Sequence, residues 1–258
     1  MPLFDTHAHL DQVEFNDDRA EVVGRARAAG VESIIAVGIS ADTSEASIAV
    51  AEQFDGVYAA VGMQPNYLAE AKPGDWERVV AMLERPKVIA IGETGLDRYW
   101  DFTPFDMQQD YFNRHLRLSQ ERGLPFIVHM RDCDEDILIM LREARQRGPL
   151  SGVLHSFTGS RAMAEETLAM GLYISFAGMV TFKKSTELRA IAAIVPDDRI
   201  LIETDSPYLS PEPMRKIKRN EPAHVQHTAA CLAELRGITL EAFGNLTTAN
   251  AKRLFNVP

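Results

Sequence analysis

This chain of 258 residues has no long apolar run, no secretory signal and few cysteines. No apolar run approaches the roughly 18 residues needed to cross a bilayer, and the N-terminus lacks the basic and apolar regions of a secretory signal. We therefore expect a soluble, cytoplasmic protein with no membrane partner. Cys133 and Cys231 are the two cysteines, and they lie far apart without metal-type spacing. We expect both to be reduced and semi-buried, which excludes disulfides and zinc-finger sites.

Basic residues are also in the minority. The chain has 27 Lys and Arg against 37 Asp and Glu, which gives a formal net charge of −10. This balance argues against the broad basic surface of a sequence-specific nucleic-acid binder. It does not exclude a local basic patch, because metal ions and a few cations can reverse the sign of the charge at one cleft.

Short apolar runs alternate with longer amphipathic stretches, and no Ser- or Pro-rich linker interrupts them, so we expect one domain over residues 1–258. The apolar runs predict eight strands: Leu3–Thr6, Ser33–Val37, Val57–Val61, Val88–Ile91, Phe126–Val128, Gly152–Leu154, Leu172–Ser175 and Arg199–Ile202. The stretches between them predict seven helices: Asp17–Ala29, Thr43–Phe54, Asp75–Glu84, Pro104–Arg122, Asp134–Arg147, Ala162–Met170 and Ser185–Ile194. From about Ala223 the pattern predicts two or three further helices.

This alternation predicts a parallel α/β protein, and a TIM (β/α)8 barrel with extra C-terminal helices is the economical arrangement for such a length. A doubly wound open sheet is the alternative. In a barrel the active site lies where strands end and the following loops begin. Residues that carry chemistry should therefore follow directly after the apolar runs.

Histidines and carboxylates do follow these runs. The first run leads into His7 and His9, two imidazoles at i and i+2 that point to the same side of an extended segment. The fourth leads into Glu93, which stands between two glycines, and the fifth and sixth lead into His129 and His155. Together they predict a ligand set for Zn, Mn, Mg or a mixed pair of ions, with Glu93 able to bridge two of them.

The eighth run delivers two acids at i and i+2, Glu203 and Asp205. Asp205 joins the predicted ligand set. Glu203 either supports the ligands from behind or is a hydrogen-bonded structural acid, and both interpretations remain open. The three other histidines, at positions 115, 224 and 227, do not follow apolar runs in this way.

Six segments resemble the TatD family of metal-dependent deoxyribonucleases, and they cover the chain in the family's order. These segments are Asp5-Thr6-His7-Ala8-His9-Leu10-Asp11, Ile91-Gly92-Glu93-Thr94-Gly95-Leu96-Asp97, His129-Met130-Arg131, Leu154-His155-Ser156-Phe157-Thr158-Gly159, Glu203-Thr204-Asp205-Ser206-Pro207-Tyr208-Leu209 and Arg219-Asn220-Glu221-Pro222. The resemblance implies a barrel of the amidohydrolase type that hydrolyses phosphodiester bonds in DNA with two divalent cations. We expect an exonuclease that acts on single-stranded ends, and the sequence leaves endonuclease action and RNA as a substrate open.

The resemblance also implies roles for individual residues. One ion would be held by His7, His9, Glu93 and Asp205, and the other by Glu93, His129 and His155. Asp205 would orient or deprotonate the attacking water, which makes it and Glu93 the expected catalytic residues.

One segment departs from the family, which usually has Gly-x-His-Pro after the third strand. Here this segment is Gly62-Met63-Gln64-Pro65. Gln64 can donate a hydrogen bond to a substrate phosphate, but it cannot carry positive charge or transfer a proton. The departure affects the expected efficiency or substrate preference and leaves the metal ligands intact.

Substrate contacts are predicted from a basic loop and an aromatic segment. Arg215, Lys216, Lys218 and Arg219 place four positive charges within five residues, as a phosphate-binding rim or as a solvated loop, with Arg131 deeper in the cleft. The aromatic side chains at positions 99, 100 and 102 either stack on bases of a single-stranded end or cap the barrel.

Two rival functions remain. A hydrolase of small-molecule C–N or C–O bonds could use the same barrel, although such enzymes usually carry a carbamylated lysine where this chain has Glu93. A non-enzymatic binding scaffold would be favoured by the loss of ligands, but all six are present. No obligate protein partner is inferred.

Overall fold

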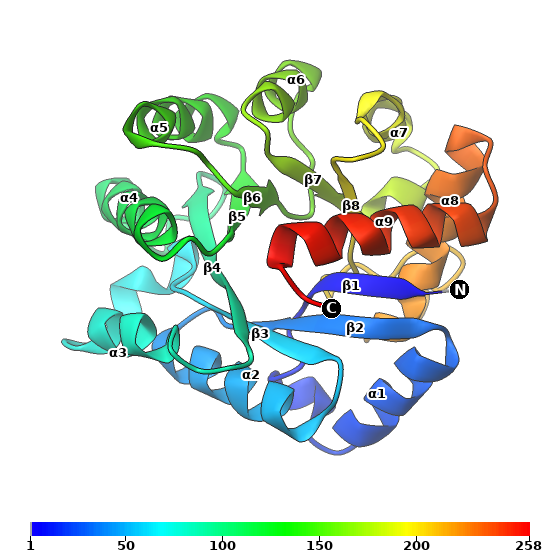
Figure 1. The fold of residues 1–258 in the computed structure, drawn as a ribbon, viewed down its shortest axis with the longest axis horizontal. Helices are drawn as coiled ribbons and strands as arrows, with labels where there is room; N and C mark the ends of the chain where they lie inside the picture. Colours follow the sequence, from blue (N-terminus) through cyan, green and yellow to red (C-terminus); the bar gives the residue numbers. More distant parts are fainter. Residues whose placement is uncertain (1) are drawn as a thin grey trace.

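The computed structural model describes residues 2–258 as a barrel of parallel strands surrounded by helices (Figure 1). The strands are adjacent in chain order: β1 (Leu3–Ala8), β2 (Val31–Val37), β3 (Val57–Val61), β4 (Val88–Asp97), β5 (Phe126–Arg131), β6 (Gly152–Leu154), β7 (Tyr173–Phe176) and β8 (Ile200–Ile202). The α-helices are α1 (Arg19–Ala28), α2 (Ala41–Gln53), α3 (Asp75–Met82), α4 (Phe105–Arg122), α5 (Asp134–Arg147), α6 (Arg161–Ala169), α7 (Thr186–Ile194), α8 (Val225–Arg236) and α9 (Leu240–Phe255). The predicted TIM barrel with extra C-terminal helices is confirmed.

Short 3-10 helices occupy several connections: η1 (Val13–Phe15), η2 (Pro65–Glu70), η3 (Gly178–Thr181) and η4 (Pro222–His224). Local signals set the helix ends. Ser40 and Thr43 form a reciprocal capping box at the start of α2, and α4 and α8 end at Gly123 and Gly237 in the left-handed conformation. No helix in residues 2–258 combines the length and the apolarity that crossing a membrane requires.

The barrel closes where β1 meets β8. The backbone N–H of Asp205 donates to the His7 carbonyl at 2.9 Å, and the N–H of His9 donates to the Ser206 carbonyl at 2.7 Å. Deeper in the seam, the Asp5 carboxyl group accepts the Thr204 N–H at 2.8 Å and the Thr204 hydroxyl at 2.6 Å. The segments that carry three of the predicted ligands, His7, His9 and Asp205, are thus the segments that close the barrel.

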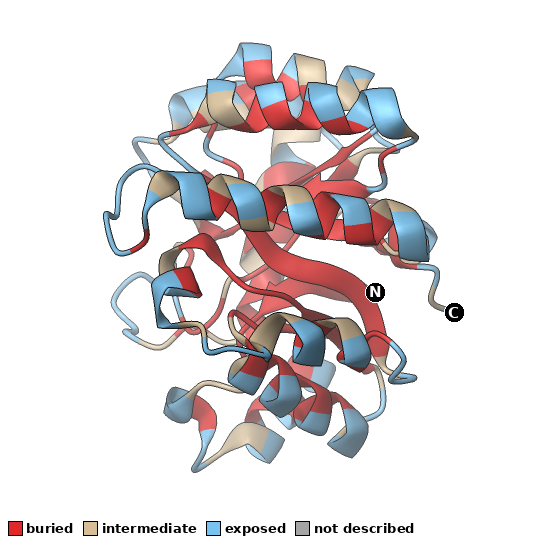
Figure 2. Cartoon of the chain, turned by 90° about the vertical axis from the view of Figure 1, so that its left-hand side faces the viewer, coloured by how far each residue is buried: buried red, intermediate tan, exposed pale blue. Residues whose placement is uncertain are grey.

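The barrel interior is filled by apolar side chains from all eight strands and from α9. Its buried members are Phe4, Ile35, Val37, Ala60, Ile89, Ala90, Ile127, Val153, Tyr173, Leu201, Ala251, Leu254 and Phe255. In Figure 2 the strands are buried and the helices turn a buried side inward and an exposed side outward. Because α9 packs its last turn against Phe4 near the start of β1, it covers the end of the barrel opposite the predicted site.

Strands β1, β4 and β5 continue beyond the apolar runs that predicted them, so that His7, Glu93 and His129 lie within strands. Between residues 5 and 8, β1 contains one more residue than β2, and between residues 91 and 94, β4 contains one more than β5. Bulges of this kind redirect side chains beside active sites. They fall here at the two segments that carry His7 and Glu93.

Glycines allow β4 to continue. Gly92 and Gly95 have φ values of 148° and 136°, which side chains rarely adopt, and a Cβ atom at Gly95 would lie 2.0 Å from the His129 carbonyl oxygen. The sequence prediction ended the strand at Ile91 because glycines usually interrupt strands. Here they let the strand pass close to β5 instead.

A buried histidine on α4 supports the turn after β3. His115 accepts the Met63 N–H at Nε2, at 3.1 Å, and its Nδ1 faces the Tyr111 carbonyl at 2.6 Å. Only the neutral imidazole can make both contacts, with Nδ1 as the donor. Burial accordingly lowers the pKa of His115 to about 4.

This burial makes His115 a source of acid sensitivity. The unfolded chain protonates this side chain near pH 6.5 and the folded chain only near pH 4, so the unfolded state binds more protons between these values. Lowering the pH from 7 to 5 should therefore remove about 2 kcal/mol of unfolding free energy through this residue. In His115→Gln, which can still accept from Met63, that part of the loss should be absent when urea unfolding is measured at both pH values. His227→Gln is the control, and equal pH dependence in wild type and His115→Gln would contradict the assignment.

Candidate metal centre and its surroundings

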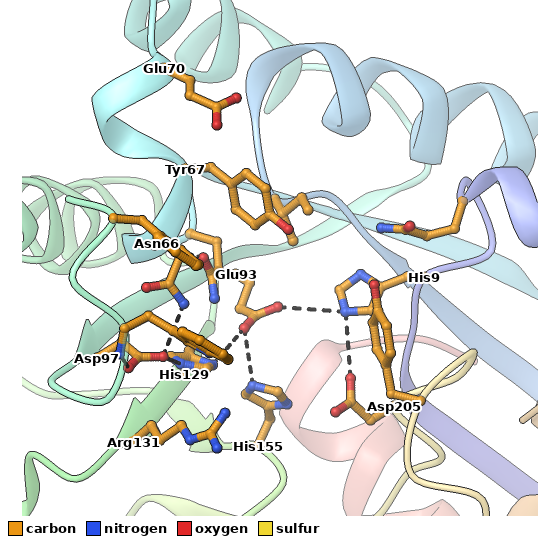
Figure 3. A pocket seen from close by; sticks show the side chains of 16 residues that line it. His9, Asn66, Tyr67, Glu70, Glu93, Asp97, His129, Arg131, His155 and Asp205 are labelled. Carbon is orange, nitrogen blue, oxygen red and sulfur yellow. Dashed lines mark hydrogen bonds and ion pairs between the residues drawn. The ribbon is translucent and has the colours of Figure 1, made fainter. Parts of the chain in front are cut away.

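The predicted ligands meet at the C-terminal mouth of the barrel, beside a cavity of about 620 Å³ (Figure 3). The cavity volume is typical of sites that take small ligands or the end of a larger one. Side chains from seven strands or the segments that follow them reach it, and the site residues predicted from the sequence that line it are His9, Gln64, Glu93, His129, Arg131, His155 and Asp205. His7 is fully buried beneath this surface.

Glu93 occupies the centre of the group, and its two carboxylate oxygens face different histidines. Oε2 lies 3.4 Å from Nε2 of His7 and 3.7 Å from Nε2 of His9. Oε1 lies 3.0 Å from Nδ1 of His129 and 3.2 Å from Nε2 of His155 (Figure 3). The carboxylate is therefore placed to serve two groups of nitrogen donors at once.

Asp205 completes the first of these groups. Its Oδ1 lies 3.5 Å from Nε2 of His9 and 3.8 Å from Nε2 of His7. Asp205 has a φ of 55°, a conformation that residues other than glycine adopt rarely and most often at functional sites. Donor atoms of His7 also lie close to those of Glu93 and His155, and the His7 and His155 rings stack with centroids 4.0 Å apart. His7 thus lies between the two predicted ligand groups rather than only in the first.

In three of the four histidines, the ring nitrogen that points away from Glu93, here called the outward nitrogen, lies against a hydrogen-bond acceptor. Nδ1 of His9 faces the Val37 carbonyl at 2.9 Å, Nε2 of His129 faces Asp97 at 2.8 Å, and Nδ1 of His155 faces Glu203 at 3.2 Å. Because a carbonyl or carboxylate can only accept, each of these nitrogens carries the proton. The inward nitrogen of each neutral ring is then a lone pair.

Those lone pairs face carboxylate oxygens, and that of His9 also faces a nitrogen of His7, whose other nitrogen has no hydrogen-bond partner within residues 2–258. Nε2 of His7 and Nε2 of His9 are 3.3 Å apart, and both face Glu93 and Asp205. Without a proton or a cation between them, such acceptors repel one another. Imidazole nitrogens held in this way by outer hydrogen bonds are typical of metal sites, so the donor set fits divalent cations.

Without a bound cation the site balances its own charge. Burial would raise the pKa of Glu93, but the positive charge of His155 and hydrogen bonds from the surrounding histidines hold it well below its usual value. Burial would lower the pKa of His9, but Asp205 and Glu93 raise it to about 9. For His7, burial and the charge of His155 lower the pKa by more than Glu93 raises it, so the pKa falls below its usual value. Protons on some rings therefore offset the buried carboxylates.

Glu203 lies behind His155. Its Oε1 faces Nδ1 of that ring and accepts the Ser156 N–H at 2.7 Å. Of the two interpretations left open by the sequence, this position agrees with the one in which Glu203 supports a predicted ligand from behind.

Asp97 is a residue of the centre to which the sequence assigned no role. Its Oδ2 accepts from His129 at 2.8 Å and from the Asn66 side chain at 2.9 Å, while its Oδ1 accepts the Tyr99 and Trp100 N–H groups at 2.8 and 3.0 Å. One buried carboxylate thus fixes a predicted ligand and the aromatic segment together. The sequence did offer a signal for Asp97. It lies an even number of residues after Glu93, which places both side chains on the same face of an extended strand.

The predicted substrate-binding residues divide between the cavity and its surroundings. Gln64 lines the cavity and accepts the Asn66 N–H at 2.8 Å through Oε1, which leaves its amide N–H groups for the cavity. Arg131 also lines it, with its guanidinium 3.6 Å from the Tyr99 ring centroid. The Trp100 and Phe102 rings stack 5.1 Å apart, and both are exposed at the rim.

The basic loop lies outside the cavity lining, and one of its members is already engaged. Arg219 makes a two-pronged ion pair with Asp18, with both N···O distances at 2.7 Å. That Arg219 binds phosphate stays a prediction, and in this structure its guanidinium attaches the loop to the segment before α1. Arg215, Lys216 and Lys218 are exposed and make no ion pair within residues 2–258.

The contacts of Asp97 generate a prediction for Asp97→Asn. An asparagine offers one acceptor oxygen and one donor group, so either His129 or the N–H groups of Tyr99 and Trp100 must lose their acceptor. If His129 loses it, its proton can move to the nitrogen that faces Glu93. We expect the affinity for Mn²⁺, measured by titration calorimetry, to fall by about 10- to 100-fold. Asp101→Asn, an exposed acid in the same segment, is the matched control. Equal affinities in both variants would refute the role of Asp97.

Comparisons with known proteins agree with this centre. A family model described as TatD related DNase matches residues 4–256. The chain is 41% identical over 255 residues to an uncharacterized metal-dependent hydrolase of Bacillus subtilis, with 99% of each protein covered. It is 37% identical over 257 residues to a Cronobacter sakazakii protein named 3'-5' ssDNA/RNA exonuclease TatD, covering 98% of this chain and 97% of that protein. A crystal structure of a TatD homolog from Escherichia coli matches with a TM-score of 0.92 at 32% identity, over 99% of this chain and 98% of that chain. The chain therefore belongs to the TatD-related DNase family of metal-dependent hydrolases.

Proposed function

We propose that this protein is a deoxyribonuclease that hydrolyses phosphodiester bonds at single-stranded DNA ends, using two divalent cations. The observation that carries the proposal is the position of Glu93, whose two oxygens face separate groups of donors beside an open cavity. Relatives named as single-strand exonucleases support the choice of substrate. In this proposal the function resides in one domain that spans residues 1–258.

The donor set supports a proposed division of ligands between two cations. His7, His9, Glu93 and Asp205 would hold one, and Glu93, His129 and His155 the other. When bound, two divalent ions would stabilise the charge that develops on phosphoryl oxygens, as Lewis acids, and would promote ionisation of water. A mixture of imidazole and carboxylate donors suits Zn or Mn better than Mg, which prefers oxygen ligands.

Asp205 is the residue proposed to take the proton from the attacking water. Burial would raise its pKa, but its hydrogen bond with His9 and the charges of His7 and His155 lower it, so the carboxylate is ionised at neutral pH. One oxygen faces the histidines, and the side chain is 14% exposed on the cavity wall. The second oxygen can therefore accept a proton from a water in the cavity.

The cavity wall supplies contacts for the substrate. Arg131 is held against Tyr99, has no ion-pair partner within residues 2–258 and can bind a phosphate oxygen. Gln64 can donate to the same phosphate through its free amide N–H groups. The exposed rings of Trp100 and Phe102 offer faces on which bases of a single strand can stack.

The central position of Glu93 predicts the effect of Glu93→Gln on metal content. An amide removes the negative charge and leaves one oxygen where two served both ions, so we expect fewer than two Mn²⁺ per chain and loss of Mn²⁺-dependent hydrolysis. Metal analysis after equilibrium dialysis measures the first effect independently of activity. Glu70→Gln, an exposed acid on the same cavity, is the control. Unchanged metal content and turnover in Glu93→Gln would exclude a bridging role.

The choice of substrate is tested with a panel of compounds and added Mn²⁺, Mg²⁺ or Zn²⁺. We expect end-labelled single-stranded DNA to be shortened, and blunt duplexes to be cleaved more slowly. A single-stranded RNA of the same sequence shows whether the protein prefers deoxyribose or ribose. A lactone and a cyclic amide test the rival function as a hydrolase of small C–O or C–N bonds. Turnover of either without any cleavage of oligonucleotides would replace the proposed function. Binding of DNA without turnover at any metal concentration would favour the scaffold.

A further inference from the structure

The loops after β7 and β8 carry five cations on one surface. Lys183 and Lys184 lie between η3 and α7, and Arg215, Lys216 and Lys218 lie between β8 and η4. All five side chains are exposed, and none forms an ion pair in the part of the chain that the structure describes. We call these five residues the basic track.

The two loops are joined to each other. The Arg215 guanidinium lies 3.7 Å from the Phe182 ring centroid, and the Glu212 N–H donates to the Thr181 hydroxyl at 2.8 Å. Arg215 lines the same hollow as Lys183 and Lys184, and the volume of this hollow is about 390 Å³. Cations distant in the sequence are thus held on one continuous surface.

The balance of charge on this surface is opposite to that of the protein. Three carboxylates line its hollows, those of Glu187, Glu212 and Glu234, and none of them makes an ion pair with the five cations. Elsewhere on the surface, arginines such as Arg78 and Arg142 each pair with carboxylates. In a chain of net charge −10, an unpaired cluster of this kind attracts a polyanion.

The basic track lies near the cavity at the candidate metal centre. Lys184 lines a second hollow of about 370 Å³ together with Thr158, and Thr158 is three residues after His155, a distance of at most about 11 Å along the chain. Tyr208 lines the cavity itself, and the next residue, Leu209, packs its carbonyl against Gly178 of the loop after β7. A strand that leaves the cavity on this side and continues over the surface therefore reaches the track.

We propose that the basic track binds the phosphates of a nucleic acid strand beyond the nucleotide in the cavity, so that the protein acts preferentially on polynucleotides. The proposal rests on the proposed function, because it takes the occupant of the track to be the continuation of the substrate. A cavity of about 620 Å³ holds only the end of such a strand, and the remainder must lie over the surrounding loops. Regularly spaced phosphates match a group of exposed, unpaired cations, which bind the backbone without reading sequence.

The test uses Lys183→Ala/Lys184→Ala, because neither lysine lines the cavity and both are exposed. Binding of a single-stranded oligothymidylate of about 20 nucleotides, protected by terminal phosphorothioates, is measured at several salt concentrations. Two lost phosphate contacts should lower the slope of log affinity against log salt by about 1.4 and weaken binding about 25-fold at 0.1 M salt. Lys183→Arg/Lys184→Arg should restore both values.

Hydrolysis of unprotected substrates supplies the second measurement. With Mn²⁺-loaded protein, kcat/KM for a 20-mer should fall in the alanine variant while that for a trinucleotide, which is too short to reach the track, serves as the reference. The matched control is Arg145→Ala/Arg147→Ala, which removes two exposed cations at the end of α5, on the far side of the barrel from the cavity. It should behave as the wild type in both assays.

Three results would overturn the proposal. Unchanged binding and salt slope would show a merely solvated loop, and the proposed function would stand. An equal loss for the 20-mer and the trinucleotide would place the lysines at the reaction site or in the fold rather than on an extended track. If the wild type hydrolyses neither substrate, the proposed function fails and the track fails with it.

Discussion

The burial of one carboxylate is the constraint on which the rest of this structure depends. Glu93 is almost completely shielded from water, and an ionised carboxylate in such a place is very unfavourable unless it is compensated. Four imidazoles surround it, and Asp205 adds a second negative charge within reach of two of them. The result is a centre whose charges balance only when protons or cations lie between its members.

Compensation requires that the rings be held in one orientation, and the fold supplies this from neighbouring strands. The acceptors behind His9, His129 and His155 come from the end of β2, from β4 and from the segment after β8. A slip in the register of any of these strands would remove the partner of a ring and change which nitrogen faces inward. The register of the barrel and the chemistry of its mouth are therefore set together.

The sequence was enough to predict the barrel, because each strand is buried on both faces and reads as a short apolar run between amphipathic helices. It also predicted which side chains meet at the mouth, since parallel strands in a barrel place their ends together. It could not predict the ends of β4, where Gly92 and Gly95 look like breakers. Nor could it predict that Arg219 pairs with Asp18, because that contact joins residues 201 positions apart and depends on the closed barrel.

The seam between β1 and β8 has a consequence for biosynthesis. Asp5 and Thr204 are separated by 199 positions, so the first strand leaves the ribosome long before its second neighbour exists. Until β8 has emerged, the edge of β1 that will face it is unpaired, and Asp5 lacks the two donors that satisfy it. His7 and His9 lack Asp205 over the same interval. A nascent chain therefore carries an open sheet edge for most of its synthesis. The barrel can close only after β8 has been synthesised.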